Sequence, residues 1–359
     1  MSTPYSITST GHTDKQSATE PRNINDVLRS HCDFWEGKGR LIRTRPYMPV
    51  TEARVPLARC GISEKDIYLE PDMLDPRDFL PDRTSNTCLT DGDVFSIRGP
   101  YKIPWTEAIM GCPIKLVPQS GASWAESCLT DLSDIEHLRL KHDNPWLQKL
   151  VDFTQVISQR HTEDYCATHT TMRGPIDMAD ALLGTERLCI AMLDQPRRVQ
   201  ALLEICTEAF IEIARSQWKE IPPIHGGYVC RYGIWAPGHV TRTQADAASM
   251  LSPELYRRNV LPFDLEVLRA FPYSIMHVHS AYPYIAEPFL NEQDVPSAIQ
   301  VGYDQPPFGP GIEQLLPTLR QMLQRKPLVF HGVVTRQEFD LVHRELPDKG
   351  ILLDLFLTD

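Results

Sequence analysis

The stretch Tyr273-Ser274-Ile275-Met276-His277-Val278-His279-Ser280 is the most informative part of this sequence. It predicts a short buried strand that ends in two histidines, His277 and His279. Side chains two positions apart on a strand point to the same face, so the two imidazoles converge on one small volume. Catalytic groups collect at the carboxyl ends of the strands of an α/β barrel, and we expect both histidines in an active site there. The alternative is that they only form hydrogen bonds within a polar barrel mouth.

Seven other segments have the length and apolar character of strands. They span residues 41–45, 93–98, 165–171, 226–232, 298–303, 327–331 and 351–357. Helical patterns separate most of them, including a predicted helix over 178–193 and another over 196–219 with Pro196 in its first turn. Short strands that mostly alternate with helices predict a (β/α)8 barrel, also called a TIM barrel.

We expect residues 23–359 to form this barrel as a single domain, because α/β barrels of this length are common. Residues 1–22 are polar and rich in Ser and Thr, which predicts a disordered N-terminal arm. The sequence ends directly after the last predicted strand, with no further helix. Either the predicted helix over 25–37 covers that strand, or the sequence belongs to a longer protein.

The composition is that of an ordinary globular protein with enough apolar residues for a core, since 42% of the 359 residues are hydrophobic and 23% are charged. The formal net charge is −11 and no run of Lys or Arg stands out, which argues against nucleic acid and anionic membranes as partners. No apolar segment is long enough to span a bilayer, and no signal-peptide pattern occurs. We expect a cytoplasmic protein that acts on a small molecule.

The nine cysteines form no CxxC motif, and their number is odd. This pattern is typical of scattered thiols in a reducing compartment and disfavours both a disulfide framework and a thiolate zinc cage. The sequence also lacks a glycine-rich phosphate loop and a nucleophile elbow, which disfavours dinucleotide-binding proteins and α/β-hydrolases.

Several short motifs follow one another in a fixed order between about residue 90 and the end of the chain. They are Pro104–Cys112, Gly174-Pro175 with Ala181–Gly184, Leu251–Glu254, His277–Ser280, and Lys326–Val329 with Gly332. Together they resemble the uroporphyrinogen decarboxylase superfamily, which also contains corrinoid-linked methyltransferases. The family fold is a (β/α)8 barrel, in agreement with the predicted strands.

The motifs of the decarboxylases themselves are only partly present. Those enzymes resemble this chain in having arginines on strand one, here Arg43 and Arg45. Their aspartate after strand two, which binds pyrrole nitrogens, falls near Lys102 or Ile103 here, and their strand-eight histidine is absent. The resemblance therefore implies weak or absent uroporphyrinogen decarboxylase activity.

The methyltransferase branch is similar to this chain at the histidine strand. Its members bind zinc with a His-x-Cys pair there and a second cysteine near the last strand. His277 matches the first position, His279 stands where the cysteine would be, and the last cysteine is missing. The resemblance thus implies a zinc site with nitrogen and oxygen ligands, which imidazole and carboxylate supply. Asp304 and His331 follow or end later strands and complete the expected ligand set, although Asp304 alternatively orients one histidine from behind.

Two charged residues near the ends of strands two and three are candidates for chemistry. Glu107 stands beside Trp105 and a proline, where a raised pKa would suit a general acid or base. Its alternative role is a helix N-terminal carboxylate. Arg173 is expected to hold a substrate carboxylate, or else to form an ion pair in a loop. Glu107, His277 and His279 are the predicted catalytic residues.

Further candidates lie at the predicted ends of strands four and six. Arg231, Tyr232 and Trp235 are expected to stack on or hydrogen-bond a substrate, the alternative being loop packing at the barrel rim. Tyr303 ends strand six and is a further expected substrate contact.

Three functions remain open from the sequence. The first is transfer of a one-carbon (methyl) group on a small substrate, assisted by zinc and with a corrinoid protein as partner. The second is a metal-free lyase of the decarboxylase type that acts on a carboxylated substrate. The third is a non-catalytic binding barrel.

Overall fold

The computed structural model describes residues 23–47, 59–62, 68–80, 90–117, 122–133, 135–141, 143–162 and 165–358. The arm predicted for residues 1–22 lies outside the described residues. Six parallel strands form one sheet in the order β1-β15-β14-β13-β12-β11, and β5 pairs in parallel with β8. The strands are β1 (Gly39–Pro46), β5 (Ile97–Arg98), β8 (Cys166–Ala167), β11 (Val240–Gln244), β12 (Tyr273–His279), β13 (Ala298–Gly302), β14 (Leu328–Val334) and β15 (Lys349–Leu357).

Segments that flank the β5–β8 pair contact the larger sheet. Before β5, the amide of Asp93 donates to the carbonyl oxygen of Ile42 on β1 at 3.0 Å. Directly after β8, the His169 ring lies 3.1 Å from the carbonyl oxygen of Val240 on β11. The eight strands thus follow each other in chain order around a ring, as expected for a (β/α)8 barrel.

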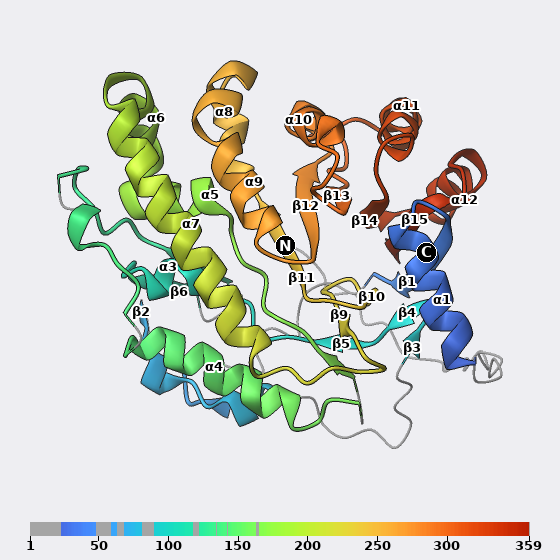
Figure 1. Cartoon of the computed structure of the whole chain (residues 1–359), viewed down its shortest axis with the longest axis horizontal. Helices are drawn as coiled ribbons and strands as arrows, with labels where there is room; N and C mark the ends of the chain where they lie inside the picture. Colours follow the sequence, from blue (N-terminus) through green and yellow to red (C-terminus); the bar gives the residue numbers. More distant parts are fainter. Residues whose placement is uncertain are drawn as a thin grey trace, which may run out of the picture.

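Helices cover the outside of the ring (Figure 1). They are α1 (Ile24–Trp35), α3 (Trp105–Ile109), α4 (Pro145–Ser158), α5 (Pro175–Leu183), α6 (Thr185–Asp194), α7 (Pro196–Trp218), α8 (Pro253–Asn259), α9 (Leu261–Arg269), α10 (Glu287–Asn291), α11 (Ile312–Leu323) and α12 (Arg336–Glu345). The predicted helix over 178–193 is divided at Gly184, whose φ of 89° is a conformation that favours glycine. Helix α1 packs beside β1 and β15, the first and last strands of the barrel (Figure 1).

The prediction of the fourth strand was wrong. The apolar segment 226–232 contributes instead to an antiparallel hairpin of β9 (Tyr228–Val229) and β10 (Trp235–Ala236). The fourth barrel strand is β11, Val-Thr-Arg-Thr-Gln, in which every residue is buried although only one is apolar. Polar side chains suit this strand because Arg242 and Gln244 face a cavity and not an apolar core.

Smaller antiparallel elements stand outside the ring. Strands β2 (Tyr68–Leu69), β6 (Ile114–Val117) and β7 (Ala122–Ala125) form one sheet, and β3 (Thr90–Asp91) pairs with β4 (Val94–Phe95). Within the described residues, no helix combines the length and apolar character needed to cross a bilayer.

Candidate functional site

A cavity of about 1000 Å³ lies at the carboxyl ends of the barrel strands. Each of the eight strands, or the segment directly after it, contributes a side chain to its wall. In strand order these include Arg43, Ile97, Thr171, Arg242, His277, Gln300, His331 and Asp354. Such convergence is the usual architecture of a barrel active site.

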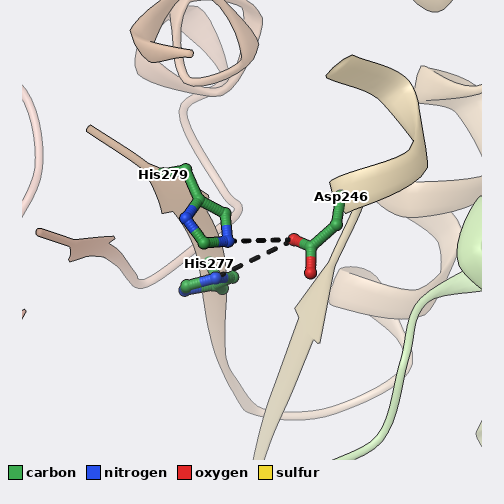
Figure 2. A group of neighbouring side chains, drawn as sticks. All are labelled: Asp246, His277 and His279. Carbon is green, nitrogen blue, oxygen red and sulfur yellow. Dashed lines mark ion pairs between the residues drawn. The ribbon is translucent and has the colours of Figure 1, made fainter. Parts of the chain in front are cut away.

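The two histidines of β12 meet at one wall of this cavity (Figure 2). Their rings form an edge-to-face pair with centroids 4.8 Å apart. The Nε2 atoms of His277 and His279 lie 3.8 and 3.7 Å from the same oxygen, Oδ1 of Asp246, which follows β11. The two imidazoles and the carboxylate therefore enclose one small space.

The opposite nitrogen of each ring is held from behind. His279 Nδ1 lies 2.8 Å from Oδ1 of Asp304, and His277 Nδ1 hydrogen-bonds Oε1 of Gln300. Both partners offer an acceptor oxygen, so the Nδ1 atom of each ring is held from behind and the Nε2 atom of each ring faces Asp246. Burial, followed by the nearby Arg242, lowers the pKa of His277 well below its ordinary value, which keeps this ring neutral.

Asp246 is fixed by a neighbouring amide. Its Oδ2 accepts a hydrogen bond of 2.6 Å from Gln244, whose Nε2 also donates to Asp177 at 2.9 Å. Burial and the charge of Asp177 raise the pKa of Asp246. A bound cation would relieve this cost, because it favours the charged carboxylate.

The residues fit a metal ion. Asp246, His277 and His279 each offer a ligand atom, and these atoms lie within 4.8 Å of one another. Two imidazole nitrogens and one carboxylate oxygen are a ligand set that catalytic zinc sites use. The acceptors behind the histidines correspond to the outer partners that orient metal-binding imidazoles.

The structure does not bring two of the expected ligands into this group. Asp304 lies behind His279 and also accepts a hydrogen bond from the amide of Ala281 at 3.1 Å. Its position is therefore that of a residue that orients His279, which was the alternative to a ligand role. His331 lines the cavity, but its Nδ1 lies 2.8 Å from Asp354. Asp246 was missed because the fourth strand was assigned to the wrong segment; as a carboxylate directly after a strand, it had the same signal as Asp304.

Asp354 is the centre of a second charged cluster. Arg43 donates to both of its oxygens at 2.7 and 2.9 Å, and Arg45 and His331 contact it at 2.9 and 2.8 Å. Although burial opposes ionisation, the hydrogen bonds from His331 and Arg43 hold the pKa of Asp354 well below its usual range. The carboxylate is thus charged and fully occupied by its neighbours.

Glu107 and Arg173 form a third charged group at the cavity. Glu107 is fully buried; its Oε2 accepts from Thr106 at 2.7 Å, and its Oε1 lies 3.3 Å from Nε of Arg173 without a hydrogen bond. Burial raises the pKa of Glu107, and the charge of Arg173 partly offsets this. Burial of the whole carboxyl group therefore raises the pKa of Glu107, and the indole of Trp105 is not its sole cause.

The expected substrate contacts divide into two sets. Arg173, Arg231 and Tyr232 line the cavity. Trp235 does not, because β10 directs it into an apolar cluster where its Nε1 donates to the carbonyl of Ile224 at 2.8 Å. Tyr303 is also outside the wall: it packs on Phe330, and its hydroxyl donates to Glu338 at 3.4 Å.

Comparisons with known proteins agree with this architecture. Residues 96–221 match the family described as uroporphyrinogen decarboxylase (URO-D). No curated protein matches the sequence significantly. Among solved structures, a methyltransferase from Methanosarcina mazei is similar, with a TM-score of 0.58, 13% sequence identity, and 92% of each chain covered.

The fold and the site define the class: a (β/α)8 barrel with a polar cavity at the carboxyl ends of its strands. The family match confirms the resemblance to the uroporphyrinogen decarboxylase superfamily, and the structural likeness confirms the barrel. Residues 96–221 thus resemble the uroporphyrinogen decarboxylase family, and the chain as a whole has the fold of the methyltransferase structure.

Proposed function

We propose that the protein transfers a one-carbon (methyl) group on a small substrate with the help of a zinc ion. The observation that carries this proposal is the convergence of two imidazole Nε2 atoms on Asp246 at the wall of the cavity. The similar fold of a protein named as a methyltransferase supports the transferred group. A corrinoid protein is the proposed partner, as in the methyltransferase branch that the sequence resembles.

Asp246, His277 and His279 would hold the zinc ion. When bound, zinc supplies Lewis-acid chemistry that activates a thiol acceptor or polarises a substrate oxygen. Side chains of the chain itself orient the ligands: Asp304 and Gln300 hold the two imidazole rings, and Gln244 holds the carboxylate. Tyr232 donates to the same Gln300 oxygen at 2.7 Å and so restrains the orienting amide.

The test is zinc content together with methyl transfer. We expect purified protein to hold about one zinc ion per chain, in keeping with a three-ligand catalytic site. Asp246→Asn and His279→Ala should lose stoichiometric zinc, whereas Cys230→Ser should keep it, because Cys230 is buried with its pKa raised to about 11 and belongs to no ligand group of the described residues. Transfer from methylcobalamin to a small thiol, followed by the absorbance of the corrinoid, should be lost with the zinc. Zinc-free parent protein would contradict the proposal.

A metal-free lyase that acts on a carboxylated substrate is the second candidate. The pairing of a buried Glu107, whose pKa is raised, with Arg173 at the cavity favours it. Decarboxylation that persists with a chelator and disappears in Glu107→Gln would select the lyase. Ligand-induced stabilisation without any turnover would instead select the non-catalytic barrel.

A further inference from the structure

The cavity has a charge opposite to that of the whole chain. Counted over the described residues, its wall holds six cationic side chains and three carboxylates, in a protein whose formal net charge is −11. The cations are Arg43, Arg45, Lys102, Arg173, Arg231 and Arg242, and the carboxylates are Glu107, Asp246 and Asp354. The excess of positive charge is therefore a local property of the cavity.

Half of these cations already have carboxylate partners. Asp354 accepts hydrogen bonds from Arg43 and from Arg45, so both arginines of β1 already have a carboxylate partner within the protein. Arg173 lies 3.3 Å from Glu107 and 3.8 Å from Asp177.

The other three cations have no such partner. Among the described residues, Lys102, Arg231 and Arg242 have no carboxylate within ion-pair distance, although the charge of Asp246 acts on Lys102 and Arg242 from farther away. Arg242 is only 6% exposed; it donates from Nη1 to Oε1 of Gln244, while its buried Nε has no partner. Burial and the charges of Arg231 and Arg242 lower the pKa of Lys102, and the charge of Asp246 only partly offsets this effect. The three cations therefore lie close together with less opposing charge than they carry. For the buried Arg242, a charge whose donor lacks a partner is costly unless a ligand supplies one.

We infer that Lys102, Arg231 and Arg242 form a subsite that binds an oxyanion group of the substrate, such as a carboxylate, a sulfonate or a phosphate. Guanidinium groups bind such oxygens through two parallel hydrogen bonds, and lysine adds a point charge. This subsite is separate from the arginines of β1. Arg242 stands on β11, the strand that leads directly to Asp246, so an anchored substrate shares the cavity with the proposed metal ligands.

The inference specifies the substrate class of the proposed function, but anion binding can be measured without turnover. The probes are sulfate and acetate, titrated into the full chain at constant ionic strength while its thermal unfolding is recorded. We expect a saturable rise in Tm for the parent protein. In Arg231→Gln the apparent affinity should fall about tenfold or more, the usual effect of removing a charge-assisted hydrogen bond.

A second cavity variant and a variant outside the cavity complete the test. Because Arg242 is buried and its replacement risks misfolding, Lys102→Gln at an exposed position is the second variant, with a smaller expected loss. Arg257→Gln, which removes an exposed partner of Glu287 outside the cavity, should bind both probes like the parent. The stronger probe identifies the class of oxyanion.

The result also separates this subsite from the proposed metal site. His279→Ala should keep its affinity for sulfate even where its zinc is lost. A parent protein without zinc that still binds sulfate through Arg231 would support the subsite and contradict the metal proposal. No saturable effect in the parent, or equal affinities in the parent, Arg231→Gln and Lys102→Gln, would overturn the subsite.

Discussion

His277 and His279 point at the same carboxylate but have different groups behind them. A carboxylate, Asp304, supports His279, whereas a neutral amide, Gln300, supports His277. A charged acceptor makes an imidazole a stronger base and a stronger metal ligand than an amide does. His279, which is also the more exposed ring, should therefore be the stronger ligand of the pair.

Replacing the carboxylate behind His279 tests this difference. We expect Asp304→Asn to weaken zinc binding about 10-fold to 100-fold, because an amide loses the charge that supports the ring. Competition with a chromogenic chelator measures the affinity. Asp294→Asn, which weakens an exposed ion pair with Arg269, is the matched control. An unchanged affinity in Asp304→Asn would show that the carboxylate has no such role.

At the scale of elements, a buried carboxyl joins two consecutive helices. Tyr256 of α8 donates to Oδ2 of Asp264 of α9 at 2.7 Å, and both side chains are buried. Burial raises the pKa of Asp264 from 3.8 to about 8, against the opposing effect of the hydrogen bond from Tyr256. The folded protein therefore holds a proton that the unfolded chain releases at a much lower pH.

This difference makes stability depend on pH. Between about pH 4 and pH 8 the unfolded chain loses the proton and the folded chain keeps it, so this group lowers the free energy of unfolding as pH rises. Asp264→Asn cannot titrate, and we expect it to gain stability relative to the parent from pH 5 to pH 8. Urea unfolding at several pH values measures this, with the exposed Glu266→Gln on the same helix as control. Parallel profiles for parent and Asp264→Asn would disprove it.

The elements that the sequence predicts well are those whose burial depends on apolar side chains. The strand ending in His277 and His279 is an example, and so is α7, where Val199, Leu202 and Phe210 are buried at helical spacing. Strand β11 could not be found this way, because Arg242 and Gln244 are buried by facing a polar cavity. Because this strand was not predicted, Asp246, which directly follows it, was not predicted as a partner of the histidines.

Positions of single side chains are harder to predict, since they depend on contacts between distant segments. Trp235 and Tyr303 were expected at the cavity from their places near strand ends, but a hairpin and helix α12 determine where they point. For Asp304, the sequence left two roles open, and only the geometry around His279 distinguishes them.

For the molecule as a whole, the charge of the cavity bears on which substrates it accepts. Lys102 and Ile103 both line the cavity, and the resemblance to the decarboxylases places their aspartate for pyrrole N–H groups near one of these two positions. A lysine offers donors and no acceptor, so those N–H groups would stay unpaired at a cost of about 1–3 kcal/mol each.

We therefore expect weak or absent conversion of uroporphyrinogen to coproporphyrinogen by the purified protein. Product analysis after anaerobic incubation with enzymatically generated uroporphyrinogen measures this. Lys102→Asp is a useful companion, since it places a carboxylate at that wall. Efficient conversion by the parent protein would contradict the prediction.

The pairing of the first barrel strand with the last has a consequence for synthesis of the protein. Arg43 on β1 and its partner Asp354 on β15 are 311 residues apart, and β1 pairs with β15 from Gly39 to Pro46. During translation, β1 leaves the ribosome early, whereas its partner β15 leaves the exit tunnel only after almost the entire chain has been made. The nascent chain therefore presents an unpaired edge and an uncompensated arginine pair during most of its elongation, a state in which protection by chaperones matters most.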